Sequence, residues 1–124
     1  EFCVMLPTCP IRKVKEIKKA INIFKKKKLN YLISVEKTIP IEWCHKVDKK
    51  GFFKKIKNIL PSIQNRQNIS QFYSPNGSIY IFNTSSFKKS KNFMNSQTYC
   101  FKMNKLYSMD IDDKIDLKII KKLI

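Results

Sequence analysis

Apolar and polar residues alternate along the first third of the chain in a way that predicts a strand, a helix and a second strand. Residues 2–6 form a short continuous apolar run, typical of a buried strand, and Pro7 and Pro10 end it. Residues 13–28 repeat apolar side chains at steps of three and four, which predicts an amphipathic helix. Its inner face would consist of Val14, Ile17, Ile21 and Phe24. Because residues 31–35 form a second apolar run, this order predicts a right-handed βαβ unit with parallel strands.

The middle of the chain predicts a hairpin, an irregular segment and a third buried strand. Residues 41–57 alternate loosely, and Asp48-Lys49-Lys50-Gly51 marks a turn between two short strands. Residues 58–74 are polar and are expected to be irregular. Asn76-Gly77 then precedes an apolar run at residues 78–82, which predicts a strand.

The last third of the chain predicts four further elements. In order, these are a short helix that ends near Ser90, a strand at 98–103, an extended segment at 108–112 and a helix at 113–123. Thr84 or Ser85 is expected to cap the short helix. The closing helix would turn four side chains inward: Ile115, Ile119, Ile120 and Leu123. Strands that alternate with helices in this way predict an α/β fold.

Lysine dominates the charge of the chain. The formal net charge at pH 7 is +17, from 26 basic and 9 acidic residues. This balance favours nucleic acid or an anionic membrane as a partner. Only Arg12 and Arg66 are arginines, however, and bidentate recognition of phosphates and guanine edges mostly uses arginine. We therefore expect the lysines to lie mainly on solvent-exposed faces, without a specific nucleic-acid or membrane partner.

The length of the chain allows one domain with a modest core. Its 124 residues, 43% of them hydrophobic, are enough to fold. No apolar run approaches the ~20 residues that span a bilayer and no secretory signal is visible, so we expect a cytoplasmic protein. Because an apolar run follows Glu1 directly, we also expect a piece of a longer chain. The four cysteines are not spaced like the ligands of a zinc site, and we expect them to be reduced. They are Cys3, Cys9, Cys44 and Cys100.

Two carboxylates near the C-terminus are candidates for binding a metal ion. Asp110 and Asp112 flank Ile111, and residues two apart in an extended segment point to the same face. Carboxylate oxygens in such a pair suit a hard cation such as Mg²⁺. The alternative is that these residues only prepare the following helix, since Asp is a favoured N-cap and Asp113 and Asp116 would complement the helix dipole.

Polar groups at the ends of the predicted strands are candidates for binding a ligand. Arg12 follows the first strand at the end where open parallel sheets bind ligands, and Arg66 lies in a polar segment. Asn76 offers a donor and an acceptor, and Gly77 permits close approach of the backbone. Their structural alternatives are an exposed helix start, a surface ion pair and an ordinary turn. His45 has no partner at a telling spacing, and we interpret it as a structural residue.

Five short segments, taken in order, resemble the motifs of one known family. They are Met5-Leu6-Pro7-Thr8-Cys9-Pro10-Ile11-Arg12, Ile33-Ser34-Val35, Arg66-Gln67, Pro75-Asn76-Gly77-Ser78-Ile79-Tyr80-Ile81 and Ser108-Met109-Asp110-Ile111-Asp112. The first is similar to L-Q-P-T-S-P-L-R, the fourth to N-G-A-I-Y-I and the last to S-x-D-I-D. These are motifs of the CMP-sialic acid synthetases, or acylneuraminate cytidylyltransferases. The resemblance covers nearly the whole chain and corresponds to the C-terminal portion of the family.

The resemblance implies a fold and a reaction. The fold is a three-layer, Rossmann-like α/β domain of the nucleotide-diphospho-sugar transferase type, incomplete at its N-terminus, with a β-rich dimerisation arm at residues 41–74. The reaction transfers CMP from CTP to the anomeric hydroxyl of a 2-keto-3-deoxy sugar acid and releases pyrophosphate. The cofactor is Mg²⁺, and family members are expected to be homodimers.

The resemblance also implies roles for particular residues. Asp110 and Asp112 match the metal-binding carboxylates and, with Arg66, the catalytic residues. Arg66 would reach phosphate or substrate, in its own site or in that of a partner subunit. Substrate contacts are expected from four further residues: Arg12, Asn76, Gly77 and Phe93.

Departures from the family pattern alter these expectations. Leu6 and Ser74 replace a Gln and an Arg that are common in sialic acid members, so a legionaminate- or pseudaminate-type sugar is as plausible as N-acetylneuraminate. The phosphate-binding R-x-G-S-K-type loop of the family would lie upstream of Glu1, so this polypeptide alone is expected to have little or no activity. Two alternatives stay open: a basic nucleic-acid-binding module, and a non-catalytic subunit that dimerises with an intact one.

Overall fold

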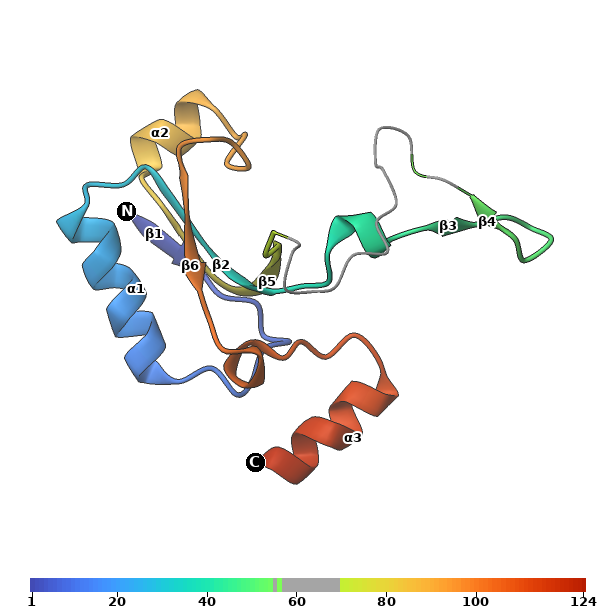
Figure 1. Ribbon diagram of the computed structural model, residues 1–124. Helices are drawn as coiled ribbons and strands as arrows, with labels where there is room; N and C mark the ends of the chain where they lie inside the picture. Colours follow the sequence, from blue (N-terminus) through green and yellow to red (C-terminus); the bar gives the residue numbers. More distant parts are fainter. Residues whose placement is uncertain (55, 57–69) are drawn as a thin grey trace. The chain divides into compact units, whose positions relative to one another are not determined.

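The computed structural model describes residues 1–54, 56 and 70–124, and Figure 1 shows their course. The chain divides into two units, which are described separately. The first consists of Glu1–Glu36 and Pro75–Ile124, and the second of Lys37–Ser74. Within the described residues, no helix is both long and apolar enough to cross a membrane.

A mixed four-stranded sheet forms the centre of the first unit, in the order β1-β5-β2-β6. The strands are β1 (Phe2–Val4), β2 (Tyr31–Lys37), β5 (Tyr73–Phe82) and β6 (Thr98–Lys102). β1 runs antiparallel to β5, and β2 runs parallel to β6. Asn83, after the end of β5, donates its backbone N–H to Asn30 O, before the start of β2 (2.9 Å). This contact sets β5 antiparallel to β2, so β1 and β2 share a direction, as predicted, but β5 lies between them.

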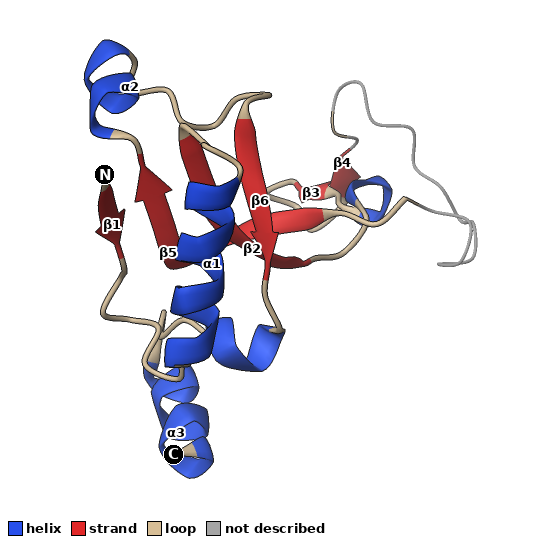
Figure 2. Cartoon of the chain, turned by 90° about the vertical axis from the view of Figure 1, so that its left-hand side faces the viewer, coloured by secondary structure: helices blue, strands red, loops and turns tan. Residues whose placement is uncertain are grey.

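The core lies between the sheet and α1 (Val14–Lys26), which crosses one face of the sheet (Figure 2). The side chains buried there are Ala20, Phe24, Leu32, Ile79, Ile81, Phe101 and Met103. Ile17 and Ile21 pack against this cluster as predicted, whereas Val14 is 65% exposed. The prediction for Val14 was wrong because it starts the helix and the packed face begins one turn later.

Asparagine begins the short helix α2 (Thr84–Lys89). The N-cap is Asn83, whose Oδ1 accepts from Ser86 N at 3.1 Å, and not Thr84 or Ser85 as predicted. An Asn side chain caps a helix as well as Ser does, and here Asn83 directly follows β5. The extended segment predicted at 108–112 was also wrong at its start, because Ser108 closes a 3₁₀ helix, η3 (Lys105–Ser108).

The closing helix α3 (Lys114–Leu123) has a well-formed start but a largely uncovered apolar face. Only Ile120 is buried, whereas Ile115, Ile119 and Leu123 are 65%, 43% and 49% exposed. The prediction that all four turn inward was therefore wrong for three of them. Periodicity identifies an apolar stripe, but it does not say how much of that stripe the rest of the chain covers.

The second unit contains the predicted hairpin. A short 3₁₀ helix, η1 (Ile41–Trp43), precedes β3 (Lys46–Val47) and β4 (Phe53–Lys54), which pair antiparallel. Asp48 organises the turn, because its Oδ1 accepts from the N–H groups of Lys50 and Phe52. Gly51 has a φ of +88°, a conformation that favours glycine. Most of the irregular segment predicted at 58–74 lies outside the described residues, and at its end Tyr73 already begins β5.

Candidate functional site

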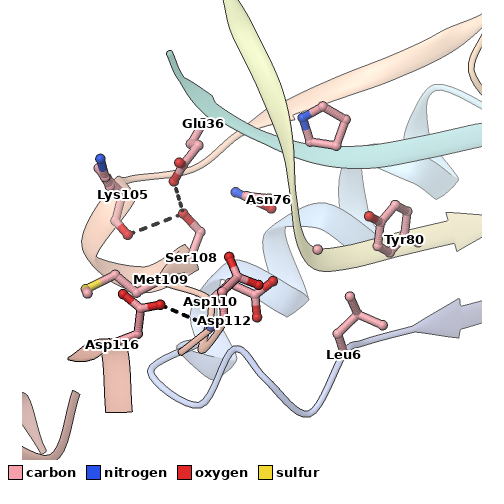
Figure 3. Close-up of a pocket in the computed structure, with 12 residues that line it drawn as sticks. Leu6, Glu36, Asn76, Tyr80, Lys105, Ser108, Met109, Asp110, Asp112 and Asp116 are labelled. Carbon is pink, nitrogen blue, oxygen red and sulfur yellow. Dashed lines mark hydrogen bonds between the residues drawn. The ribbon is translucent and has the colours of Figure 1, made fainter. Parts of the chain in front are cut away.

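Acidic side chains surround a cavity of about 460 Å³ in the first unit. Its walls come from the loop after β1, the end of β2, the middle of β5 and the segment between η3 and α3 (Figure 3). The lining residues are Leu6, Glu36, Pro75, Asn76, Gly77, Tyr80, Lys105, Ser108, Met109, Asp110, Asp112 and Asp116. Four of the nine acidic residues of this strongly basic chain therefore line one cavity.

Asp110 and Asp112 both line this cavity, as their spacing predicts (Figure 3). Ile111 between them is half-buried, and its backbone N–H donates to Thr8 O at 2.9 Å, which ties the segment to the loop after β1. Capping of α3 falls to other carboxylates, because Asp113 Oδ1 accepts from the backbone N–H groups at the helix start and Asp116 Oδ2 accepts from Asp113 N. The Asp110 and Asp112 side chains are thus not required for the cap.

The donor set suits a hard cation held by two carboxylates. No group of three or more His, Cys, Asp or Glu side chains could hold a metal ion among the residues that the structure describes. A cation bound by Asp110 and Asp112 would complete its coordination with water or with ligand oxygens, which is how Mg²⁺ usually binds beside phosphates.

Asn76 is held by a buried hydrogen-bond network. Its side chain is 8% exposed, and its Oδ1 accepts from Ser34 Oγ at 2.6 Å and from Ser78 N at 3.2 Å. Ser34 Oγ in turn accepts from Ile79 N at 2.7 Å. The Nδ2 atom of Asn76 is buried without a hydrogen-bond partner. Since buried polar atoms are almost always paired, this nitrogen is a candidate to donate to a ligand.

Gly77 occupies a position that no other residue fits without a shift. Its φ is +70°, and a Cβ atom there would lie 2.9 Å from Leu6 Cδ1 and 3.5 Å from Asp110 Oδ2. The missing side chain therefore allows Leu6 and Asp110 to approach β5 at the wall of the cavity. Glycine suits this position for two reasons: it adopts a positive φ without strain, and it has no Cβ to contact Leu6 or Asp110.

Cys9 lies behind the cavity wall as a protonated thiol. It is 1% exposed, and its Sγ donates to Asn76 O at 3.5 Å. Burial and the nearby charge of Asp110 raise the pKa of the Cys9 thiol to about 11. Burial also raises the pKa of Tyr80, which lines the cavity. Neither group is ionised near neutral pH, and this keeps further negative charge out of an already acidic site.

The other predicted substrate-binding residues do not line the cavity. The Arg12 guanidinium donates to two backbone carbonyls, Leu6 O and Ser78 O, both at 2.8 Å. Arg12 therefore joins the loop after β1 to β5. The ring of Phe93 lies against Tyr80 and Phe82, with centroids 6.1 Å and 5.1 Å apart. Arg66 lies outside the described residues.

Sequence reasoning missed the far wall of the cavity. Glu36 ends the buried part of β2, and its carboxylate accepts from Ser108 Oγ at 3.1 Å. Lys105 lines the same side (Figure 3). The sequence did contain a signal for Glu36, because this acidic residue directly follows the predicted strand 31–35. Ser34, which holds Asn76, lay in a predicted strand and in a segment that resembles the family, but the sequence assigned it no role.

The fold and the site together define a mixed α/β protein with an acidic cavity that contains a buried asparagine. No protein-family model matches the chain. Over 94% of its length the chain is 30% identical to an N-acylneuraminate cytidylyltransferase of Streptococcus agalactiae. It is 28% identical over 97% of its length to a CMP-N,N'-diacetyllegionaminic acid synthase of Legionella pneumophila. An N-acylneuraminate cytidylyltransferase of Escherichia coli is 28% identical over 95% of the chain.

These similarities confirm the resemblance predicted from the motifs. They extend along nearly the whole chain, so they include both units. The chain spans 28% of the length of the Streptococcus and Escherichia relatives and 52% of the Legionella relative. It is therefore similar to part of each of these relatives.

Proposed function

We propose that this chain forms part of a cytidylyltransferase that transfers CMP from CTP to a nonulosonic sugar acid. The observation that carries the proposal is the cavity that Asp110 and Asp112 line together with the buried amide of Asn76. These three residues come from two of the segments that resemble the family. The similarity to enzymes named for N-acylneuraminate and for legionaminic acid supports the sugar class.

In the proposed reaction, the anomeric hydroxyl of the sugar acid attacks the α-phosphorus of CTP in line. A bond forms between the anomeric oxygen and phosphorus, the bond to the pyrophosphate oxygen breaks, and the hydroxyl proton passes to solvent. Mg²⁺ held by Asp110 and Asp112 would offset the negative charge of the phosphates. Without such a cation, the carboxylates around the cavity would repel both anionic substrates.

The remaining predicted roles are part of the same proposal. Asn76 contacts substrate directly, and Gly77 contributes the space that lets the ligand and Asp110 approach β5. Arg12 supports the wall through its two carbonyl contacts. Arg66 contacts phosphate or substrate, and Phe93 contacts the sugar acid, as the resemblance to the family implies. The domain is proposed to be of the nucleotide-diphospho-sugar transferase type.

A pyrophosphate-release assay tests the proposed reaction. The full-length gene product is incubated with CTP, Mg²⁺ and either N-acetylneuraminate or N,N'-diacetyllegionaminate. We expect turnover with one of the two sugar acids. Asp112→Asn should lower the activity at least about 10²-fold, because it removes one of the two carboxylates that hold Mg²⁺. Glu16→Gln, in the first turn of α1, is the matched control and should retain activity. Equal activity of Asp112→Asn and the parent would contradict the assigned role.

The 124-residue chain by itself is proposed to have little or no activity. In the family, the phosphate-binding loop supplies backbone donors for the phosphates, and this chain lacks a matching segment. The same assay on the 124-residue chain should release pyrophosphate at or near background. Full activity of this chain would refute that part of the proposal.

A further inference from the structure

Asn76 lines the cavity, and the two ends of its amide differ: Oδ1 accepts two hydrogen bonds, whereas Nδ2 makes none. Asn76 is 8% exposed, and its buried Nδ2 has no hydrogen-bond partner. Figure 3 shows this nitrogen on the side that faces Glu36 and Ser108. Leaving a buried N–H donor unpaired is costly, so the position is suited to a ligand that brings an acceptor.

Two fixed donors determine which way the amide points. Ser78 contributes a backbone N–H, which cannot accept a hydrogen bond. The Ser34 hydroxyl already accepts from Ile79 N, so its proton is directed to Asn76 Oδ1. A flipped amide would set its own N–H groups against both donors. The orientation with Nδ2 toward the cavity follows from this network.

We propose that Ser34 is a positioning residue, which holds Asn76 so that its Nδ2 donates to an oxygen of the bound substrate. This inference rests on the proposed function and deepens it. The ligand group is an oxygen acceptor: a phosphate oxygen of CTP, or a carboxylate, hydroxyl or acyl oxygen of the sugar acid. A cation is excluded at this atom because an N–H donor repels it.

The first experiment observes the Asn76 side-chain amide directly by NMR, in the 124-residue chain and in the full-length gene product. The probes are Mg²⁺ alone, Mg²⁺ with CTP, N-acetylneuraminate and N,N'-diacetyllegionaminate. We expect CTP or a sugar acid to shift the two Nδ2 proton resonances, and the arm that does so identifies the source of the oxygen. No shift with any of these ligands in either protein would overturn the inference.

The second experiment is a double-mutant cycle on affinity for the ligand that shifts the amide. Ser34→Ala should weaken binding about three- to tenfold, the value of one neutral hydrogen bond, because the amide is no longer held. In an Asn76→Ala background the same change should have little further effect on affinity, although it should still lower stability. An equal effect of Ser34→Ala in both backgrounds would mean a merely structural serine and would overturn the proposal.

Two further variants separate positioning from loss of folding. Ser34→Thr retains the hydroxyl and should recover part of the affinity lost in Ser34→Ala. Asn76→Asp has the same shape but presents an oxygen to the cavity in place of the donor, so it should bind at least about tenfold more weakly. Unchanged affinity for Asn76→Asp would contradict the assignment of Nδ2 as the donor.

The outcomes also separate this inference from the proposed reaction. Pyrophosphate release that is insensitive to Ser34 and Asn76 would leave the reaction intact and overturn the inference. An amide shift with the sugar acid or CTP, coupled to Ser34, would support the inference even if no pyrophosphate were released.

Discussion

At the scale of single residues, the site depends on what glycine and asparagine permit at the middle of β5. Gly77 combines a φ of +70° with close contacts to Leu6 and Asp110. Asn76 next to it combines burial with an unpaired donor. The sequence could mark this pair as a candidate, but from these two residues alone an ordinary turn was the favoured interpretation. The contacts that Asn76 and Gly77 make with β2 and with the loop after β1 decide between a ligand site and a turn. The sequence could not show these contacts, because β2 and that loop lie far from β5 along the chain.

Gly77→Ala should destabilise the chain more than Gly51→Ala. Both glycines have positive φ, but a Cβ at Gly51 meets nothing within 4 Å, whereas at Gly77 it would clash with Leu6. We expect losses of about 1 kcal/mol for Gly51→Ala and about 1–2 kcal/mol for Gly77→Ala, where the end of the Leu6 side chain must also move, measured by urea unfolding. Leu6→Ala should remove part of the excess. Equal losses at the two glycines would show that space at Gly77 does not matter.

Cys9 should resist alkylation and should make stability depend on alkaline pH. Burial and Asp110 raise the pKa of its thiol from 9.0 to about 11, so the folded state holds the proton more tightly than the unfolded state. The resulting stabilisation is present below pH 9.0 and is lost as the pH rises toward 11.

Two measurements test the Cys9 prediction. Iodoacetamide at about pH 8 should modify exposed Cys100 well before Cys9, because thiolate is the reactive form. Urea unfolding at increasing pH should show a smaller alkaline loss for Cys9→Ala than for the parent. Equal alkylation of both cysteines in the folded chain would contradict the assigned burial.

At the scale of elements, α3 directly follows the carboxylate segment, which is residues 110–112, and the helix is held mainly by its first turn. The capping box of Asp113 and Asp116 satisfies the first N–H groups, whereas Ile120 is the helix's buried side chain. The sequence predicted this helix and its acidic start correctly. It could not predict which apolar residues are covered, because coverage depends on surfaces from the rest of the chain.

Asp113→Ala should loosen α3 and reduce the order of the carboxylate segment. Loss of a side-chain N-cap costs about 0.5–2 kcal/mol. Amide hydrogen exchange in Lys114–Leu123 should therefore become faster, while exchange in β2 should change little. Lys118→Ala, on the exposed side of the same helix, is the control. Unchanged exchange in α3 for Asp113→Ala would show that the cap does not limit its opening.

At the scale of the whole molecule, charge and exposed apolar surface describe different interactions. The net charge of +17 favoured nucleic acid, yet the cavity is lined by four carboxylates. The second unit exposes Val47, Phe52 and Phe53 on its hairpin, at 65%, 68% and 81%. Exposed apolar residues of this kind suit a contact with a partner, and we propose that this unit is the arm of the homodimer that the family resemblance implies.

Phe53→Asp should shift the proposed dimer toward monomer. A charge placed in an apolar interface is costly to bury, so dissociation should increase at least about tenfold. Sedimentation of the full-length gene product measures the change, and Lys50→Asp in the adjacent turn is the control for added charge. A parent that is monomeric at all concentrations would refute the dimer. Nucleic-acid binding with a steep dependence on salt would instead favour the basic-module alternative.

The sequence by itself determined most of the helices and strands, the pairing of Asp110 with Asp112 on one side of their segment, and the family resemblance. These are local properties, since periodicity, turn residues and motif letters act over a few neighbouring positions. Only the tertiary structure decided that β5 lies between β1 and β2, that Glu36 and Ser108 close the cavity, and that Ser34 fixes the direction of the Asn76 amide. These features depend on contacts between residues as far apart as Ser34 and Asn76, which no local pattern specifies.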